Sequence, residues 1–290
     1  MKIGLQIPDF TWPGGAKEIG PTLAKIARTA DAGGFDPIGV MDHLFQIQSL
    51  GPPEREMLEG YTTLGFLAAN TSRAHLLTVV TGAVYRFPGV LAKTVTTLDV
   101  LSGGRAILGV GAAWNEYEAR SLGIPFPPVA ERFEWLEDAL MLCHRMWSGD
   151  ERPFKGKRFE FERPLASPQP VSRPRPRIMI GGMGEQKTLR LVAKYADACN
   201  LFPTPEVHKK LDVLKRHCER EHRNYDEIEK TVMFRFDVGD RGQNVPQILQ
   251  QLRPFAKLGF TTAIGGVRDV WKIEPLEIMA RDLIPAAAEL

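Results

Sequence analysis

The chain has 290 residues, of which 43% are hydrophobic and 25% are charged, a composition typical of a globular protein with a substantial core. Its net charge of +2 excludes a broad positive surface for nucleic acid. The three cysteines lack zinc-ligand spacing, and no apolar run approaches the ~20 residues needed to cross a bilayer. We therefore expect a cytoplasmic protein with reduced thiols and without a nucleic-acid or membrane partner.

Apolar, β-branched runs alternate with helical periodicity along the first half of the chain. Residues 2–7 form an apolar run closed by Pro8, and a helical pattern follows over residues 17–32 until Gly33. The same order then repeats three times, with predicted strands and helices at 35–44, 61–72, 76–85, 89–102, 106–111 and 129–147. Each predicted strand is thus followed by a helix.

A segment of different composition interrupts this order at residues 150–176. The stretch FKGKRFEFER alternates like a hairpin around Gly156, and the proline-rich SPQPVSRPRP that follows cannot continue a helix or a central strand. We interpret this segment as a surface insertion. The regular order then returns, with predicted strands and helices at 177–182, 185–196, 197–202, 205–222, 231–238, 245–258, 261–266 and 274–289.

Eight strand–helix pairs predict a single domain, residues 1–290, folded as a closed (β/α)8 TIM barrel with a small hairpin insertion after the fourth main helix. Closure is favoured because it removes the exposed edges that an open eight-stranded sheet would keep. An open, doubly wound sheet is the alternative. Barrel active sites are built from the loops after the strands, so the residues at those strand ends are the candidates for function.

Aromatic, small and amide residues outnumber charged residues in these loops. Only one of the six histidines, His43, lies at a predicted strand end, so the sequence predicts no metal site. The G-x-S-x-G motif of a serine nucleophile is absent. An aldolase- or isomerase-like barrel is disfavoured because no lysine or carboxylate pair lies at the predicted strand ends.

Two glycine-rich turns could hold a planar ligand with a phosphate tail. ILGVGAAWNE (107–116) has Trp114 where the dinucleotide-binding fingerprint requires a third glycine. Its small residues are Gly109, Gly111, Ala112 and Ala113. They could leave room for a flat ring, with Asn115 as a hydrogen-bonding group, or they could serve tight packing between strand and helix. GGMGE (181–185) precedes a helix whose N-terminus would suit an anion, although a plain strand–helix turn is the alternative.

The chain resembles the luciferase-like flavin and deazaflavin oxidoreductases, in particular the branch that uses coenzyme F420. The stretches that carry the resemblance are FDPIGVMDHL, the block from LLTVVTGAVY through GVGAAWNEYEARSLGIPF, ERFEWLEDAL and RIMIGGMGEQKTLRLVAKYADACN. The resemblance implies a barrel with the deazaflavin at its mouth. The ring would be backed by a bulge in the third strand near Val79, Val80 and Thr81, which often contains a non-prolyl cis peptide.

The resemblance also implies roles for individual residues. Asp42 and His43 match an Asp-His pair beside the ring, Gly109, Gly111 and Asn115 match the loop after the fourth strand, and the 181–184 segment, with Gly181, Gly182, Met183 and Gly184, matches the phosphate end. The sugar-phosphate dehydrogenases of the family carry a glutamate acid directly after the second glycine, and here that residue is Ala112. The resemblance therefore does not extend to dehydrogenation of the same substrate.

Hydride transfer between F420 and a small organic substrate is the function we expect from these residues. The substrate would lie between the ring and Phe10, Trp12 and Phe45. His43 would donate or accept the proton, or would have a purely structural role. The alternatives are an FMN-dependent monooxygenase and a barrel that binds a ligand without catalysis, and we expect a homodimer in each case.

Overall fold

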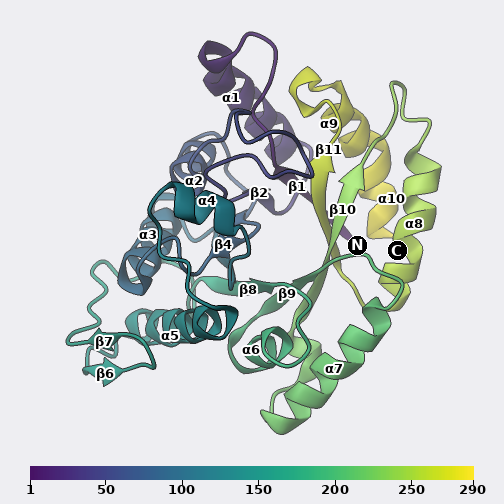
Figure 1. Cartoon of the computed structure of the whole chain (residues 1–290). Helices are drawn as coiled ribbons and strands as arrows, with labels where there is room; N and C mark the ends of the chain where they lie inside the picture. The colour runs from purple at the N-terminus through teal and green to yellow at the C-terminus, as the bar shows by residue number, and fades with distance from the viewer.

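The computed structural model describes residues 1–290, and its central feature is a closed ring of eight parallel strands (Figure 1). In ring order the strands are β1 (Lys2–Ile7), β2 (Ile38–Val40), β3 (Leu76–Thr78), β5 (Ala106–Gly111), β8 (Arg177–Gly181), β9 (Ala198–Leu201), β10 (Glu229–Phe236) and β11 (Thr262–Val267). The ring closes where β11 pairs with β1, for example Gly4 with Ile264. The predicted (β/α)8 barrel is confirmed.

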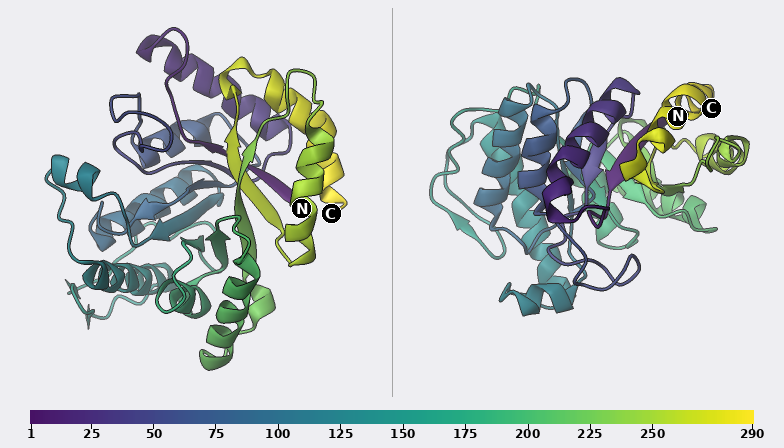
Figure 2. Two further views of the ribbon diagram at one scale, coloured as in Figure 1. Left: turned by 45° about the vertical axis from the view of Figure 1, so that its right-hand side comes forward. Right: turned by 90° about the horizontal axis from the view of Figure 1, so that it is seen from above.

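Helices surround the ring on the outside, as the views in Figure 2 show. The main helices are α1 (Ala16–Ala32), α2 (Gly60–Ala69), α3 (Pro88–Leu101), α5 (Val129–Ser148), α6 (Thr188–Tyr195), α7 (Val207–Arg220), α8 (Val245–Lys257) and α9 (Glu274–Ile278). Shorter pieces are α4 (Glu116–Ser121), η1 (Tyr225–Glu227) and η2 (Val270–Lys272). None of the helices is both long and apolar enough to span a bilayer.

The C-terminal helix differs from the prediction of one continuous helix over residues 274–289. It is divided into α9, a wider π-helical turn η3 (Met279–Leu283) and a last segment, α10 (Ile284–Ala288). Pro285 lies in this region and has no N–H to donate to the preceding turn, which interrupts the regular α-helical bonding. The segment ends beside the start of the chain, where the Met1 amino group donates to the Ala287 carbonyl.

The third strand of the barrel contains a one-residue bulge. It consists of β3 and a short continuation, β4 (Thr81–Gly82), and both pair with β5. Leu77 pairs with Ile107 and Thr81 pairs with Val110, so four steps along the third strand oppose three steps along β5. The peptide bond between Val79 and Val80 is cis, which confirms the expected bulge and its non-prolyl cis peptide.

Gly109 allows the bulged strand to lie against β5. A Cβ atom at this position would lie 1.9 Å from the carbonyl oxygen of Thr78, and that carbonyl belongs to the backbone and cannot rotate away. The Thr78 hydroxyl in turn donates to the Gly109 carbonyl at 2.9 Å. Gly109 therefore packs the barrel wall directly below the bulge.

A layer of apolar side chains fills the lower part of the barrel interior. It consists of Leu77, Ile107, Met179, Ala198 and Ile264, with Val79 and Val80 packed against it. These residues come from the third, fourth, fifth, sixth and eighth strands of the ring. The barrel is therefore closed at its N-terminal end, and any ligand must enter from the carboxyl ends of the strands.

The insertion contains the predicted hairpin, formed by β6 (Phe154–Lys155) and β7 (Glu160–Phe161) on the outer side of α5 (Figure 1). The buried carboxylate of Asp138 on α5 accepts the backbone N–H groups of Lys157, Arg158 and Phe159 at 2.7 to 3.1 Å. The hairpin turn is thus fastened to the barrel through its backbone.

The neighbouring carboxylate, Glu137, joins the same turn to α6. Its side chain is 8% exposed and lies within 3.3 Å of the charged groups of Lys157, Arg190 and Lys194. Burial alone would raise the pKa of Glu137, but these cations, Lys194 first, lower the pKa to about 2. The ionised carboxylate therefore stabilises the folded chain at neutral pH.

We expect Glu137→Gln to lower the free energy of unfolding by about 2 kcal/mol at pH 7, less than the full pKa shift implies because the cations are partly exposed to water. Since the pKa is lowered on folding, the contribution is present above the ordinary carboxyl pKa of about 4.3 and disappears as the pH falls toward 2. Urea unfolding of the unsubstituted protein and of Glu137→Gln, at pH 7 and at pH 3, measures this contribution to the free energy of unfolding. The control is Glu134→Gln, which removes a partly exposed ion pair with Arg158 from the same helix. It should lower the free energy of unfolding by less than about 1 kcal/mol.

Candidate active site

A large cavity opens at the carboxyl ends of the strands. Its volume is about 970 Å³, and residues from all eight strands or the loops after them contribute to its wall. The loop between β2 and α2 covers part of the opening, where Arg55 bonds Asp9 Oδ2 and the Leu50 carbonyl, both at 3.0 Å. Such a cavity is large enough for a tricyclic ring and a small second molecule.

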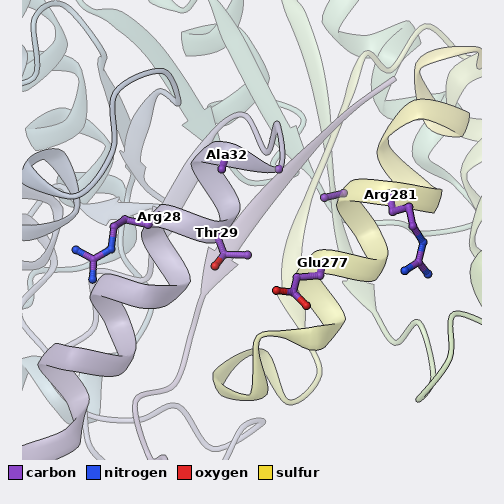
Figure 3. A pocket seen from close by; sticks show the side chains of 7 residues that line it. Arg28, Thr29, Ala32, Glu277 and Arg281 are labelled. Carbon is purple, nitrogen blue, oxygen red and sulfur yellow. The ribbon is translucent and has the colours of Figure 1, made fainter.

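A second hollow lies outside the barrel, between α1 and the C-terminal helix (Figure 3). Thr29 and Glu277 face the gap between the two helices, whereas Arg28 and Arg281 point away from it (Figure 3). Arg28 donates to Asn70 Oδ1 and Arg281 donates to Asp282. This hollow is remote from the strand ends, so the cavity at the barrel mouth is the candidate active site.

The bulge of the third strand forms one wall of the cavity. The Val80 side chain fills the space that side chains on β5 and β8 would otherwise occupy, because Cβ atoms at Gly111 and Gly181 would lie 3.2 and 3.0 Å from its methyl groups. Gln6 Nε2 donates to the Val79 carbonyl at 3.3 Å, and Thr81 Oγ1 lies 2.9 Å from the Tyr61 hydroxyl. The wall is thus apolar around Val80 and is held on both sides by hydrogen bonds.

His43 lies at the edge of this wall and is held by a buried carboxylate. Its Nδ1 is 2.7 Å from Glu118 Oε2, with the histidine side chain 12% exposed and the glutamate fully buried. Because an ionised carboxylate only accepts hydrogen bonds, Nδ1 carries the proton. The other ring nitrogen, Nε2, has no hydrogen-bond partner within the protein and is available to a ligand in the cavity.

Glu118 accepts hydrogen bonds from three segments of the chain. Its carboxylate accepts the backbone N–H groups of Leu44 and Phe45, the Tyr85 hydroxyl at 3.1 Å and Asn115 Nδ2 at 3.0 Å. Burial alone would raise the pKa of Glu118, but the hydrogen bonds from His43 and the two backbone groups outweigh it and lower the pKa. Glu118 is therefore ionised at neutral pH, and it fixes the orientation of the His43 ring.

Asp42 lies behind the cavity wall. Its side chain is buried and bonds the Arg86 guanidinium at 2.5 and 2.9 Å. Arg86 also pairs with Glu59, whose carboxylate caps the start of α2. Asp42 is next to His43 in sequence, but this ion-pair network directs its carboxylate away from the cavity. Asp42 therefore supports the wall and does not line it.

A row of free backbone N–H groups follows β8. The N–H groups of residues 183 to 188 donate to no acceptor in the protein, and α6 begins at the last of them. Gly182 has a φ of +123°, a conformation that favours glycine. Together with the positive end of the α6 dipole, these groups form a site that suits a phosphate.

The cavity brings together most of the predicted site residues, namely Trp12, His43, Val79, Val80, Thr81, Gly111, Ala112, Ala113, Gly181 and Gly182. Met183 and Gly184 lie beyond its wall in the row of free N–H groups. The other predicted positions do not reach it: Phe10 is fully buried against Trp12, Phe45 packs on Tyr117, Gly109 packs the barrel wall, and Asn115 is the N-cap of α4. These residues make contacts within the protein that the sequence pattern did not reveal.

Several residues of the site were missed from the sequence. Glu118, Tyr85 and Arg86 belong to the networks described above, and Arg235 and Trp271 line the far side of the cavity. Asn115 and Glu118 have the spacing of a helix-capping pair, which would have predicted α4. It would not have predicted that the Glu118 side chain turns to His43, because that contact spans 75 residues.

The comparisons with known proteins agree with this architecture. A family model described as "Luciferase-like monooxygenase" matches residues 1–266. A relative from Nakamurella multipartita, an F420-dependent glucose-6-phosphate dehydrogenase, is 31% identical over 226 residues, which cover 76% of this chain and 65% of the relative. The match thus spans slightly less than two thirds of that relative's length.

Solved structures share the fold at lower identity. A monooxygenase from Streptomyces bottropensis has a TM-score of 0.80 at 18% identity and covers 98% of this chain, with 99% of its own chain aligned. An F420-dependent secondary alcohol dehydrogenase, solved with an F420-acetone adduct, has a TM-score of 0.80 at 17% identity and 99% coverage of both chains. At these identities the likeness establishes the barrel alone.

Proposed function

We propose that this chain, which belongs to the luciferase-like monooxygenase family, is an oxidoreductase that transfers hydride between coenzyme F420 and a small organic substrate. The relatives named as F420-dependent dehydrogenases support the choice of cofactor. The observation that carries the proposal is a cavity with an apolar wall and a histidine with a free ring nitrogen, next to a row of unpaired N–H groups that follows β8.

The residues present fit a deazaflavin. The Val79–Thr81 bulge would support one face of the ring system, and the glycines at positions 111 and 181 leave the room that the Val80 side chain occupies in this wall. The N–H groups of residues 183–188 would hold the phosphate of the side chain. When bound, the deazaflavin would supply carbon 5 of its ring as the hydride donor or acceptor.

The protein's own contribution is to position the substrate and to move one proton. We propose that His43 Nε2 gives a proton to the substrate oxygen in reduction and removes it in oxidation. Glu118 holds Nδ1 of the ring and so directs Nε2 to the substrate, and the apolar wall would keep water from the reacting atoms. Ala112 supplies no carboxyl group, so the proposal does not extend to the glucose-6-phosphate activity named for the relatives.

Titration of the purified chain with F420 and with FMN tests the cofactor. We expect F420 to bind, and the deazaflavin nucleoside that lacks phosphate to bind at least about 10-fold more weakly, because it cannot use the free N–H groups. Tight FMN binding without F420 affinity would favour an oxygen-using monooxygenase instead. Binding of neither cofactor would leave a ligand-binding barrel without redox chemistry.

Turnover is the second part of this test. Reduced F420 with a panel of small carbonyl and enone acceptors, followed by the absorbance of the oxidised deazaflavin, would identify the reaction. A cytoplasmic location and a homodimer remain predictions from the sequence. Size-exclusion chromatography with light scattering tests the homodimer.

A further inference from the structure

Arg235 is an exposed arginine of the cavity wall that has no ion-pair or hydrogen-bond partner in the protein. It lies near the carboxyl end of β10, where residues alternate between the two faces of the sheet. Thr231 marks the interior face, because its hydroxyl accepts Asn200 Nδ2 at 2.8 Å and contacts the Met179 sulfur. Arg235 is four residues further along, on the same face, and lines the cavity.

The other cations of the cavity are already committed to protein partners. Arg55 pairs with Asp9 at 3.0 Å, and Arg268 pairs with Asp237 at 2.9 Å. No lysine lines the cavity. The Arg235 guanidinium forms neither an ion pair nor a hydrogen bond with the protein, although Asp237 is only two residues away. It is the one arginine of the cavity wall that is free to bind an anionic ligand.

Apolar side chains make up most of the cavity wall around Arg235, and the one carboxylate in the loop after β11, Asp269, is ion-paired with Lys272. The same side of the cavity is lined by Trp12, Phe202, Met233, Phe234, Val270 and Trp271. An apolar wall with one free guanidinium matches a molecule with an apolar body and a single negative charge. A carboxylate fits this position best, because its two oxygens match the planar fork of the guanidinium, whereas a phosphate ester would call for more than one free cation.

Arg235 is separate from the row of free N–H groups after β8. In the ring, β9 lies between β8 and β10, so the strands that lead to the two sites are roughly 10 Å apart at the usual strand spacing. The cofactor phosphate and the second anion would therefore be bound by different groups. We propose that Arg235 binds the carboxylate of the substrate, and that the substrate is a small organic acid with an apolar body; this inference rests on the proposed function.

Calorimetric titration with 3-phenylpropionate and its neutral isostere 3-phenylpropionamide tests the proposal, in the presence and in the absence of F420. We expect the unsubstituted protein to bind the acid at least about 10-fold more tightly than the amide. Arg235→Gln should reduce this preference to less than about 2-fold and change the amide affinity by less than about 3-fold. Arg253→Gln, which removes an exposed arginine of α8 outside the cavity, should keep the full preference.

Three results of the probe titrations would overturn the proposal. These are equal affinities for acid and amide in the unsubstituted protein, a preference that survives Arg235→Gln, or no binding of either probe at about 10 mM. An F420 affinity at least about 10-fold weaker in Arg235→Gln would assign the residue to the anionic tail of the cofactor and would also overturn it. If F420 does not bind but the acid preference depends on Arg235, the anion site stands and the proposed function fails.

Discussion

Replacing His43 by glutamine is expected to lower kcat by about 10²- to 10⁴-fold, the usual contribution of a positioned acid or base. Glutamine keeps about the volume of the side chain and can still donate to Glu118, but its amide does not act as an acid or a base near neutral pH. The F420 affinity should change less than about 3-fold, since the wall and the free N–H groups are intact. Stopped-flow turnover and a separate cofactor titration measure the two quantities.

A matched substitution separates this result from a general loss of structure. His208→Gln changes an exposed histidine on α7, outside the cavity, and should leave kcat unchanged. Undiminished turnover in His43→Gln would contradict the proton-transfer role. A loss of cofactor binding as large as the loss of turnover would instead indicate that His43 supports the site, which is the structural alternative considered from the sequence.

The barrel could be predicted from the sequence because each strand and helix is specified locally. The run AILGVG predicts a strand over residues 106–111, and the structure places β5 at these residues. The buried strands are short apolar runs, the helices have apolar residues at every third or fourth position, and glycines mark the helix ends. This information does not depend on distant contacts, so a reading of local pattern is enough to obtain the order of the elements.

The polar groups of the site could be predicted only in part, because their orientation depends on distant partners. Asp42 was expected to lie beside the ring as a cofactor contact, and its carboxylate bonds Arg86 instead, 44 residues away. Phe10 has the loop position of a substrate contact, but it is part of the core beside Trp12. Arg235 gave no signal at all, since one arginine in a strand is ordinary and its lack of a partner appears only when the ring is closed.

The resemblance to a known family supplied what the local pattern could not. The bulge at Val79 and Val80 has no sequence signature of its own, because both residues are ordinary strand formers. The register against β5 and the close approach of Thr78 to Gly109 explain why the bulge can form here. The structure thus gives a physical reason for the bulge, which the sequence suggested only through the resemblance to a known family.

Replacing Glu118 by alanine is expected to destabilise the protein by about 3 to 5 kcal/mol and to lower kcat by about 100-fold. The substitution leaves the N–H groups of Leu44 and Phe45 and the Tyr85 hydroxyl without their acceptor, and buried donors without a partner are costly. It also frees the His43 ring to rotate. Urea unfolding measures the first effect and steady-state turnover the second.

The acid side of the stability profile gives an independent check on Glu118. Because folding lowers its pKa, the ionised carboxylate stabilises the protein above the ordinary carboxyl pKa of about 4.3, and this stabilisation is lost as the pH falls through the lower pKa of the folded state. The stability difference between the unsubstituted protein and Glu118→Ala should therefore narrow below about pH 4.

The matched control is Glu116→Ala, two residues away on the exposed face of α4. It should lower the free energy of unfolding by less than about 1 kcal/mol and leave kcat unchanged. Equal stability and turnover in Glu118→Ala would contradict the orienting role of Glu118, although its buried carboxylate is the only protein group that hydrogen-bonds the His43 ring.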